Sequence, residues 1–136
     1  MDSGSAMGES NRFEGVTPIL NVKNVPASLD HYVRVLGFTK DWDWGEPPTF
    51  ASVSRGDVCI FFCEDGQGHP GTWMSVFVED VDALYEEYRA SGATIRRPPT
   101  NYPWGMREML VEDPDGHCLR MGTGTEAPSD DVAPGA

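Results

Sequence analysis

The sequence repeats itself once, and this repeat limits the folds open to the chain. The run Val22–Val25 is matched 56 residues later by Val78–Val81, and Gly37 is matched 55 residues later by Gly92. Two copies of one unit are too few for a solenoid, which needs three or more. We therefore expect two similar halves that share one core.

Each half has the pattern of a strand, a helix and three further strands. Apolar residues spaced i, i+3, i+4 and i+7 predict two amphipathic helices, one through Leu29, Tyr32, Val33 and Leu36 and one through Val81, Leu84, Tyr85 and Tyr88. Gly37 and Gly92 suit left-handed C-caps. Ser28 is expected to cap the first helix and Asp80 the second.

The strand-like runs flank these helices in the same order in both halves. They are 16–22, 38–44, 49–54 and 57–63 in the first half, and 72–78, 94–97, 106–112 and 117–121 in the second. Tight turns are predicted at Arg55–Asp57 and Asp113–Gly116, and Pro98–Gly105 reads as a loop inserted in the second half. The fold class is therefore α+β: two tandem βαβββ modules forming a curved, mixed, mostly antiparallel sheet, with the helices on its outer face.

A chain of 136 residues makes about one domain. That domain is expected over 13–122, with modules at about 15–65 and 72–122. The flanking segments 1–12 and 123–136 are rich in Gly, Ser, Ala and Pro, and they are expected to be disordered tails.

The charge of the chain excludes some partners. Twenty-two acidic and ten basic residues give a net charge of −12, of which the span 13–122 carries −8. This excess of acid argues against nucleic acid and against an anionic membrane surface, and no apolar run is long enough to cross a bilayer. It suits either simple solubility or a cationic ligand.

The cellular location is expected to be the cytoplasm. The first residues have no basic start and no apolar stretch, so they do not form a secretory signal. Three cysteines make an odd number without metal-type spacing, as in a reduced chain.

Side-chain parity separates the two faces of each strand. In 72–78, Met74, Val76 and Val78 form an apolar face, whereas Trp73, Ser75 and Phe77 form a mixed, aromatic one. Parity assigns Cys59, Phe61 and Cys63 to the helix side, as core residues rather than nucleophiles, and Cys118 to the pocket side. The aromatic faces are expected to form the concave wall of a ligand pocket.

The most specific stretches are Pro103–Leu110, Asp113–Cys118 and Thr72–Val76. With the duplicated βαβββ plan, they resemble the vicinal oxygen chelate superfamily, which includes glyoxalases, extradiol dioxygenases and bleomycin-resistance proteins, and they resemble the bleomycin-resistance branch most. Met109, His117 and Arg120 depart from that pattern. The resemblance implies a homodimer that binds an aromatic or glycopeptide-type drug in grooves between its subunits, without chemistry.

The resemblance also allows a test for a metal. The enzymes of this superfamily hold a divalent metal with side chains from the first and last strands of each module. The repeat offset of 56 residues pairs Thr17 with Trp73, and the alignment of the turn glycines Gly56 and Gly116 pairs Ile60 with Arg120. These residue types do not supply a set of N, O and S ligands, so no metal and no other cofactor is expected.

Tryptophans next to acids form the candidate site. Aromatic faces beside Asp43, Glu46 and Glu108 suit a flat, positively charged ligand, through stacking and cation–π contacts. The alternative for each tryptophan is a place in the core or in a dimer interface. The expected ligand-binding residues are Trp42, Trp44, Glu46, Phe50, Ile60, Trp73, Ser75, Tyr102, Trp104, Met106, Glu108 and Arg120.

The function favoured by these observations is sequestration of a bulky aromatic, cationic antibiotic or natural product. Two enzymatic alternatives stay open. One is a glyoxalase-like lyase or isomerase, or a dioxygenase, with a non-standard metal site. The other is a cofactor-free enzyme that uses Glu108 as a base. Glu108 is equally compatible with a surface position on an edge strand.

Overall fold

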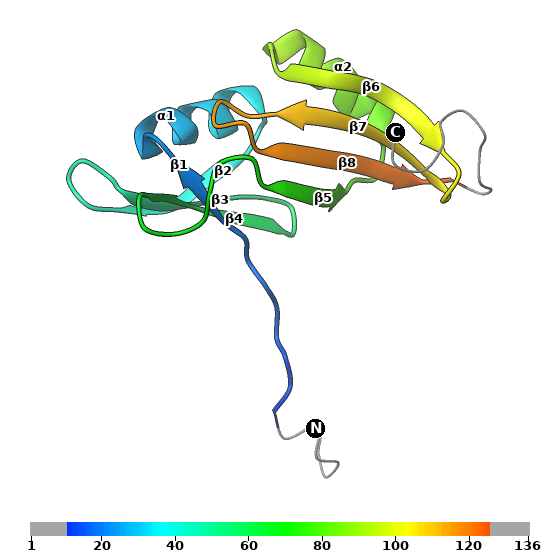
Figure 1. Ribbon diagram of the computed structural model, residues 1–136. Helices are drawn as coiled ribbons and strands as arrows, with labels where there is room; N and C mark the ends of the chain where they lie inside the picture. The colour runs from blue at the N-terminus through cyan, green and yellow to red at the C-terminus, as the bar shows by residue number, and fades with distance from the viewer. Residues whose placement is uncertain (1–10, 126–136) are drawn as a thin grey trace.

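A computed structural model describes residues 11–125 (Figure 1). The first half contains β1 (Ile19–Val22), α1 (Val25–Asp30), the π-helical turn η2 (His31–Val35), β2 (Thr39–Trp44), β3 (Phe50–Arg55) and β4 (Val58–Glu64). The second contains β5 (Trp73–Phe77), α2 (Val81–Ser91), β6 (Thr94–Tyr102), β7 (Met106–Glu112) and β8 (Cys118–Gly124).

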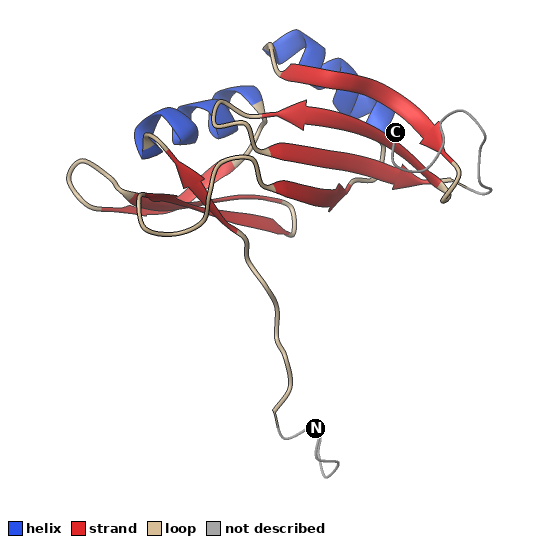
Figure 2. Cartoon of the chain, viewed as in Figure 1, coloured by secondary structure: helices blue, strands red, loops and turns tan. Residues whose placement is uncertain are grey.

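The strands form two four-stranded sheets of the same topology, in the orders β1-β4-β3-β2 and β5-β8-β7-β6. β1 pairs in parallel with β4, and β5 with β8; the other pairings are antiparallel. Figure 2 shows the helices on one side of the strands. The expected α+β fold of tandem βαβββ modules is thus confirmed, with the strands divided between two sheets.

The core lies between the helices and one face of each sheet. Leu20, Phe62 and Met121 from the strands pack there with Tyr32 and Tyr88 from the helices, all of them buried. We call the opposite face of each sheet, which the helices do not cover, the open face. The parity expected for β5, and for Cys118 in β8, is confirmed.

The first helix begins earlier than expected. Asn24 is the N-cap, and its side-chain oxygen accepts a hydrogen bond from the Ala27 N–H at 2.8 Å. The predicted cap Ser28 lies inside the helix and is buried, with its hydroxyl directed to Asp115. Pro26 is compatible with this start because the first turn of a helix does not need its N–H.

The second helix agrees with its predicted ends. Asp80 is the N-cap and accepts a hydrogen bond from the Ala83 N–H at 3.1 Å. Gly92 ends the helix in the left-handed region at φ 88°.

Two elements extend beyond their predicted bounds. β6 continues through most of the expected loop Pro98–Gly105 as far as Tyr102, and it tolerates its prolines because it is an edge strand with register shifts. β8 continues to Gly124 because its pairing with β7 extends to Met106, and the Thr123 hydroxyl donates to the Val78 carbonyl and accepts from the Val81 N–H. The remainder of the two expected tails, 1–10 and 126–136, lies outside the described residues.

The predicted parity of β4 was wrong by one residue. Arg55 pairs with Val58 across the first hairpin, leaving two residues in the turn, whereas Glu112 pairs with Cys118 across the second, leaving five. The turn glycines therefore do not align the last strands of the two modules, and a shift of one residue exchanges the faces of a strand.

The strand pairings give the correct alignment. Ile19 pairs with Phe61, and Ser75 pairs with Arg120, so Phe61 is the counterpart of Arg120. Ile60 lies in the core at 0% exposure. Phe61 lies instead on the open face with the half-buried Cys59 and Cys63, which are therefore not core residues.

Buried polar contacts join the two modules. The Nδ1 atom of His117 accepts a hydrogen bond from the Thr72 N–H at 2.9 Å, so Nε2 carries the proton and donates to the Asn21 carbonyl at 2.6 Å. The Tyr32 hydroxyl donates to Asp113 at 2.8 Å. Burial raises the pKa of Asp113, and burial beside this carboxylate raises that of Tyr32.

Candidate ligand-binding site

Three aromatic rings gather on the open face of the first sheet. Trp42 lies 5.3 Å from Phe50 and 5.3 Å from Phe61, and the two phenylalanine rings are 5.6 Å apart, measured between centroids. Trp44 follows on the same face opposite Phe50 and is 70% exposed. We call Trp42, Trp44, Phe50, Phe61 and Asp41 the first-sheet cluster.

Asp41 belongs to this cluster because β2 contains a bulge. The register shifts between Lys40 and Trp42, so Asp41 and Trp42 both face Ser52. The Asp41 carboxylate accepts hydrogen bonds from Ser52 at 2.8 Å and from Ser54 at 2.7 Å. Strict alternation along β2 would place Asp41 on the face opposite Trp42, and the bulge brings both side chains to the same face.

A second set of aromatic residues lies on the open face of the second sheet. Tyr102 and Trp104 stack with their centroids 4.6 Å apart and their planes 17° from parallel. The Arg120 guanidinium carbon lies 5.2 Å from the Tyr102 centroid and 5.4 Å from that of Trp104. These distances are within cation–π range, so Arg120 supplies the cation for both rings.

Glu108 fixes the position of Arg120. Its carboxylate accepts a hydrogen bond from the Arg120 Nε at 2.7 Å, and its side chain is only 5% exposed. A Cβ at Gly122 would lie 2.6 Å from the Glu108 Cγ and 3.0 Å from the end of Met106. The glycine therefore leaves the space in which Glu108 reaches Arg120.

Further along this face, Arg96 connects Trp73 with Glu112. Its guanidinium lies 5.6 Å from the Trp73 centroid and 3.5 Å from the Glu112 carboxylate. Cys118 shares this face, as expected from parity, but it is fully buried, and burial raises the pKa of its thiol. We call Trp73, Arg96, Arg97, Tyr102, Trp104, Glu108, Glu112 and Arg120 the second-sheet cluster.

The structure places most of the predicted site residues in one of these clusters or beside them. Ser75 pairs with Arg120 and Met106 pairs with Tyr102, both on the second sheet. Glu46 lies exposed between β2 and β3. Ile60 is the exception, because it points into the core. Within residues 11–125, no ring contact, hydrogen bond or ion pair joins the two clusters.

Sequence reasoning missed Asp41, Phe61, Arg96 and Arg97. Phe61 could have been found from the difference in turn length between the two hairpins. The bulges in β2 and β6 that bring Asp41, Arg96 and Arg97 to the open faces have no signal in a pattern of strict alternation.

Most of the acids expected to attract a cation already form a salt bridge with a basic side chain. Asp43 lies 3.0 Å from Lys40 and pairs with Ala51, a residue of the core face, and Glu108 is bound by Arg120. Asp41 is exposed and is therefore the carboxylate of the first-sheet cluster that a ligand can reach. As a base, Glu108 would first have to lose its bond to Arg120.

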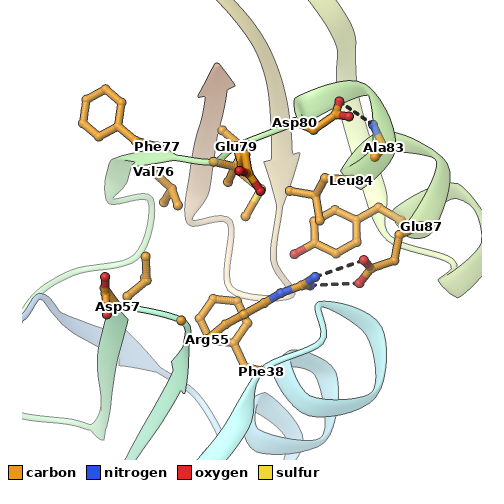
Figure 3. A pocket seen from close by; sticks show the side chains of 15 residues that line it. Phe38, Arg55, Asp57, Val76, Phe77, Glu79, Asp80, Ala83, Leu84 and Glu87 are labelled. Atoms are coloured by element: carbon orange, nitrogen blue, oxygen red, sulfur yellow. Dashed lines mark hydrogen bonds and ion pairs between the residues drawn. The ribbon is translucent and has the colours of Figure 1, made fainter. Parts of the chain in front are cut away.

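A separate cavity of about 720 Å³ lies between α2, the end of β5 and the β3–β4 hairpin. Figure 3 shows Arg55 reaching from the hairpin toward Glu87 on α2. These side chains are 2.8 Å apart, and their hydrogen bond lowers the pKa of Glu87, whereas burial raises that of nearby Tyr88 to about 12. None of the predicted site residues lines this cavity.

The positions implied for a metal do not fit one. Phe61 replaces Ile60 in the corrected alignment and offers no ligand atom, while the Arg120 guanidinium is a permanent cation. Among residues 11–125, no three His, Cys, Asp or Glu side chains are grouped so that they could hold a metal ion. In the same residues, no helix is long and apolar enough to cross a membrane.

Comparisons with known proteins agree with this geometry. The model of the glyoxalase/bleomycin resistance protein/dioxygenase superfamily matches residues 12–121. The bleomycin-binding protein of bleomycin-producing Streptomyces verticillus, solved with copper(II)-bleomycin, is 32% identical, with 84% of this chain and 98% of that one covered and a TM-score of 0.69.

Two further solved structures are similar. TioX from Micromonospora sp. ML1 is 25% identical, with 81% of this chain and 99% of that one covered and a TM-score of 0.70. A superfamily member from Sphaerobacter thermophilus is 26% identical, with 82% and 98% covered and a TM-score of 0.68. The comparison with curated proteins gives no match.

Proposed function

Because the chain belongs to the glyoxalase/bleomycin resistance protein/dioxygenase superfamily, we propose that it sequesters a bulky aromatic antibiotic or natural product without changing it chemically. The observation that carries this proposal is the placement of all four tryptophans. Trp42, Trp44, Trp73 and Trp104 are 39%, 70%, 53% and 41% exposed, and each belongs to one of the two clusters. Large aromatic surface left in water marks a site that a ligand or partner covers.

A homodimer is part of the proposal. The first-sheet cluster and the second-sheet cluster lie on different sheets of one chain. We propose that the first-sheet cluster of one protomer faces the second-sheet cluster of the other, so that each groove has two aromatic walls. Light scattering is expected to give twice the chain mass of 14.9 kDa, and a monomer would remove the shared groove.

The class of ligand follows from the same surfaces. Stacking on several rings favours a planar aromatic group, with each contact contributing about 0.5–1.5 kcal/mol beyond area burial. Asp41 offers a carboxylate to any cationic part of the ligand. The similarity to a bleomycin-binding protein supports a glycopeptide-type drug. The cytoplasm is the proposed location, in keeping with three free cysteines.

Titration of tryptophan fluorescence with bleomycin and a panel of polycyclic drugs tests the proposal. We expect quenching at micromolar drug, weakened about tenfold or more by Trp104→Ala, since removing a stacking platform costs about 1–3 kcal/mol. The control Tyr85→Ala changes an aromatic residue on α2, away from both clusters. Chromatography should recover each bound drug unaltered. Absence of quenching across the panel would contradict binding, and a new product would contradict sequestration.

A further inference from the structure

The open face of the second sheet carries more positive than negative charge, in contrast to the rest of the chain. Arg96, Arg97 and Arg120 face Glu108 and Glu112, which gives this face a net charge of +1 from three cations and two anions. Each carboxylate is already paired, Glu108 with Arg120 and Glu112 with Arg96. A cationic ligand would therefore meet arginines here, and no free carboxylate.

Arg97 has no carboxylate partner within residues 11–125. Its hydrogen bond goes to the Tyr102 hydroxyl at 3.1 Å, and its side chain is half-buried. Arg97 and Arg120 therefore contact the same ring, one at its hydroxyl and the other over its face. Two guanidinium groups thus converge on Tyr102. The positive charge of Arg97 is not balanced by a carboxylate within the described residues.

Arg120 is held in place by its neighbours and keeps hydrogen-bond donors available for a ligand. Its Nε is bound to Glu108, and its plane is supported by Tyr102 and Trp104. Its two terminal nitrogens make no hydrogen bond within the described part of the chain, and its side chain remains 25% exposed. A guanidinium fixed in this way can donate to an incoming anion at little entropic cost, because the arginine fork matches a carboxylate.

We infer that the second-sheet cluster is a subsite for a planar aromatic ring that carries a carboxylate. The ring covers the exposed indole of Trp104 or Trp73, and the carboxylate accepts hydrogen bonds from Arg97 and Arg120. This inference rests on the proposed function and refines it: the cationic ligand expected from the sequence applies to the first sheet, where Asp41 lies, and the second sheet selects an anionic group.

Three probes built on one naphthalene ring system test this inference by calorimetry at low salt. They are naphthalene-2-carboxylate, naphthalene-2-carboxamide and 2-naphthyltrimethylammonium, which share one ring system and differ in charge. We expect the carboxylate to bind at least about tenfold more tightly than the amide, since charge-assisted hydrogen bonds are about twice as strong as neutral ones, and the ammonium to bind most weakly. Equal or tighter binding of the amide or the ammonium would overturn the inference.

Two variants assign the preference to the arginines. Arg97→Gln and Arg120→Gln should each reduce the preference for the carboxylate to near unity while the amide still binds. Arg120→Gln leaves the buried Glu108 without its partner, so Arg97→Gln is the safer test of the two. Arg89→Gln on α2, where Arg89 pairs with Glu86, is the matched control and should keep the preference.

Failure of this inference differs from failure of the proposed function. If none of the three probes binds at millimolar concentration, the carboxylate subsite is overturned, whereas quenching by the bulky drugs would still support sequestration. If the variants retain the full preference for the carboxylate, the anion binds elsewhere on the protein and the assignment to Arg97 and Arg120 is wrong.

Discussion

His31 occupies an unusual position for a titratable side chain. It begins the π-helical turn η2, and its Nε2 atom is buried without a hydrogen-bond partner among the described residues. Burial lowers the pKa of His31 from its ordinary value of 6.5, against the opposing effects of Asp113 and Asp30. Protonation would place an N–H donor where no acceptor is available, so the folded state favours neutral His31.

This residue predicts a pH dependence of stability. Because the pKa is lower in the folded state, the stabilisation is complete above pH 6.5 and is lost as the pH falls through the folded-state value. Between its folded-state pKa and pH 6.5, His31 should contribute a slope of up to about 1.4 kcal/mol per pH unit to the free energy of unfolding. Urea denaturation between pH 7 and pH 5 should therefore show a shallower decline for His31→Gln than for the original chain.

His69→Gln provides the control for this measurement. His69 lies in the exposed segment between β4 and β5. Its variant should follow the original chain across the same pH range. A decline that is equally steep in His31→Gln would show that other groups govern the acid sensitivity.

At the scale of elements, the end of α2 depends on one backbone conformation. Gly92 has φ 88°, and its N–H donates to the Tyr88 carbonyl at 3.1 Å. A Cβ at this position would meet no atom within 4 Å, so a side chain would be opposed by the left-handed backbone and not by crowding.

Gly92→Ala should lower the free energy of unfolding by about 1–2 kcal/mol, the cost of the left-handed conformation for a residue with a Cβ. Gly15→Ala is the matched control, since a Cβ there also meets nothing within 4 Å and its φ is not in the left-handed region. Urea denaturation should show a change below about 0.5 kcal/mol for this control. Equal losses in both variants would refute a role for backbone conformation at Gly92.

For the whole molecule, the net charge opposes the proposed dimer. Each chain carries −12, so two protomers repel one another at low ionic strength. Raising the salt from 10 to 150 mM shortens the Debye length from about 30 Å to about 8 Å. Screening should therefore strengthen a dimer whose interface is aromatic.

Sedimentation equilibrium at the two salt concentrations tests this prediction. We expect the dissociation constant of the dimer to fall by about threefold or more as the salt is raised. A dissociation constant that rises with salt would show instead that complementary charges hold the interface. Both measurements use the same protein sample, so that salt concentration is the quantity that differs between them.

Much of the fold is determined by the sequence itself, because it depends on local periodicity and on the repeat. The spacing of Leu84, Tyr85 and Tyr88 predicted α2, Asp80 and Gly92 predicted its ends, and the match between Val22–Val25 and Val78–Val81 predicted two equivalent modules. Parity likewise identified the open face of β5, with Trp73 exposed and Val76 buried. The helix, its ends and the strand parity each involve neighbours in the chain, and the repeat is visible by comparing the two halves of the sequence, so side-chain type and spacing suffice.

The tertiary structure decided which side chains meet. A two-residue turn and a five-residue turn shifted β4 by one position, which moved Ile60 into the core and Phe61 onto the open face. A bulge brought Asp41 beside Trp42. The pairing of Glu108 with Arg120 joins residues that lie twelve positions apart on adjacent strands. Strand register and bulges depend on packing across the whole sheet, so residue spacing along the chain could not specify them.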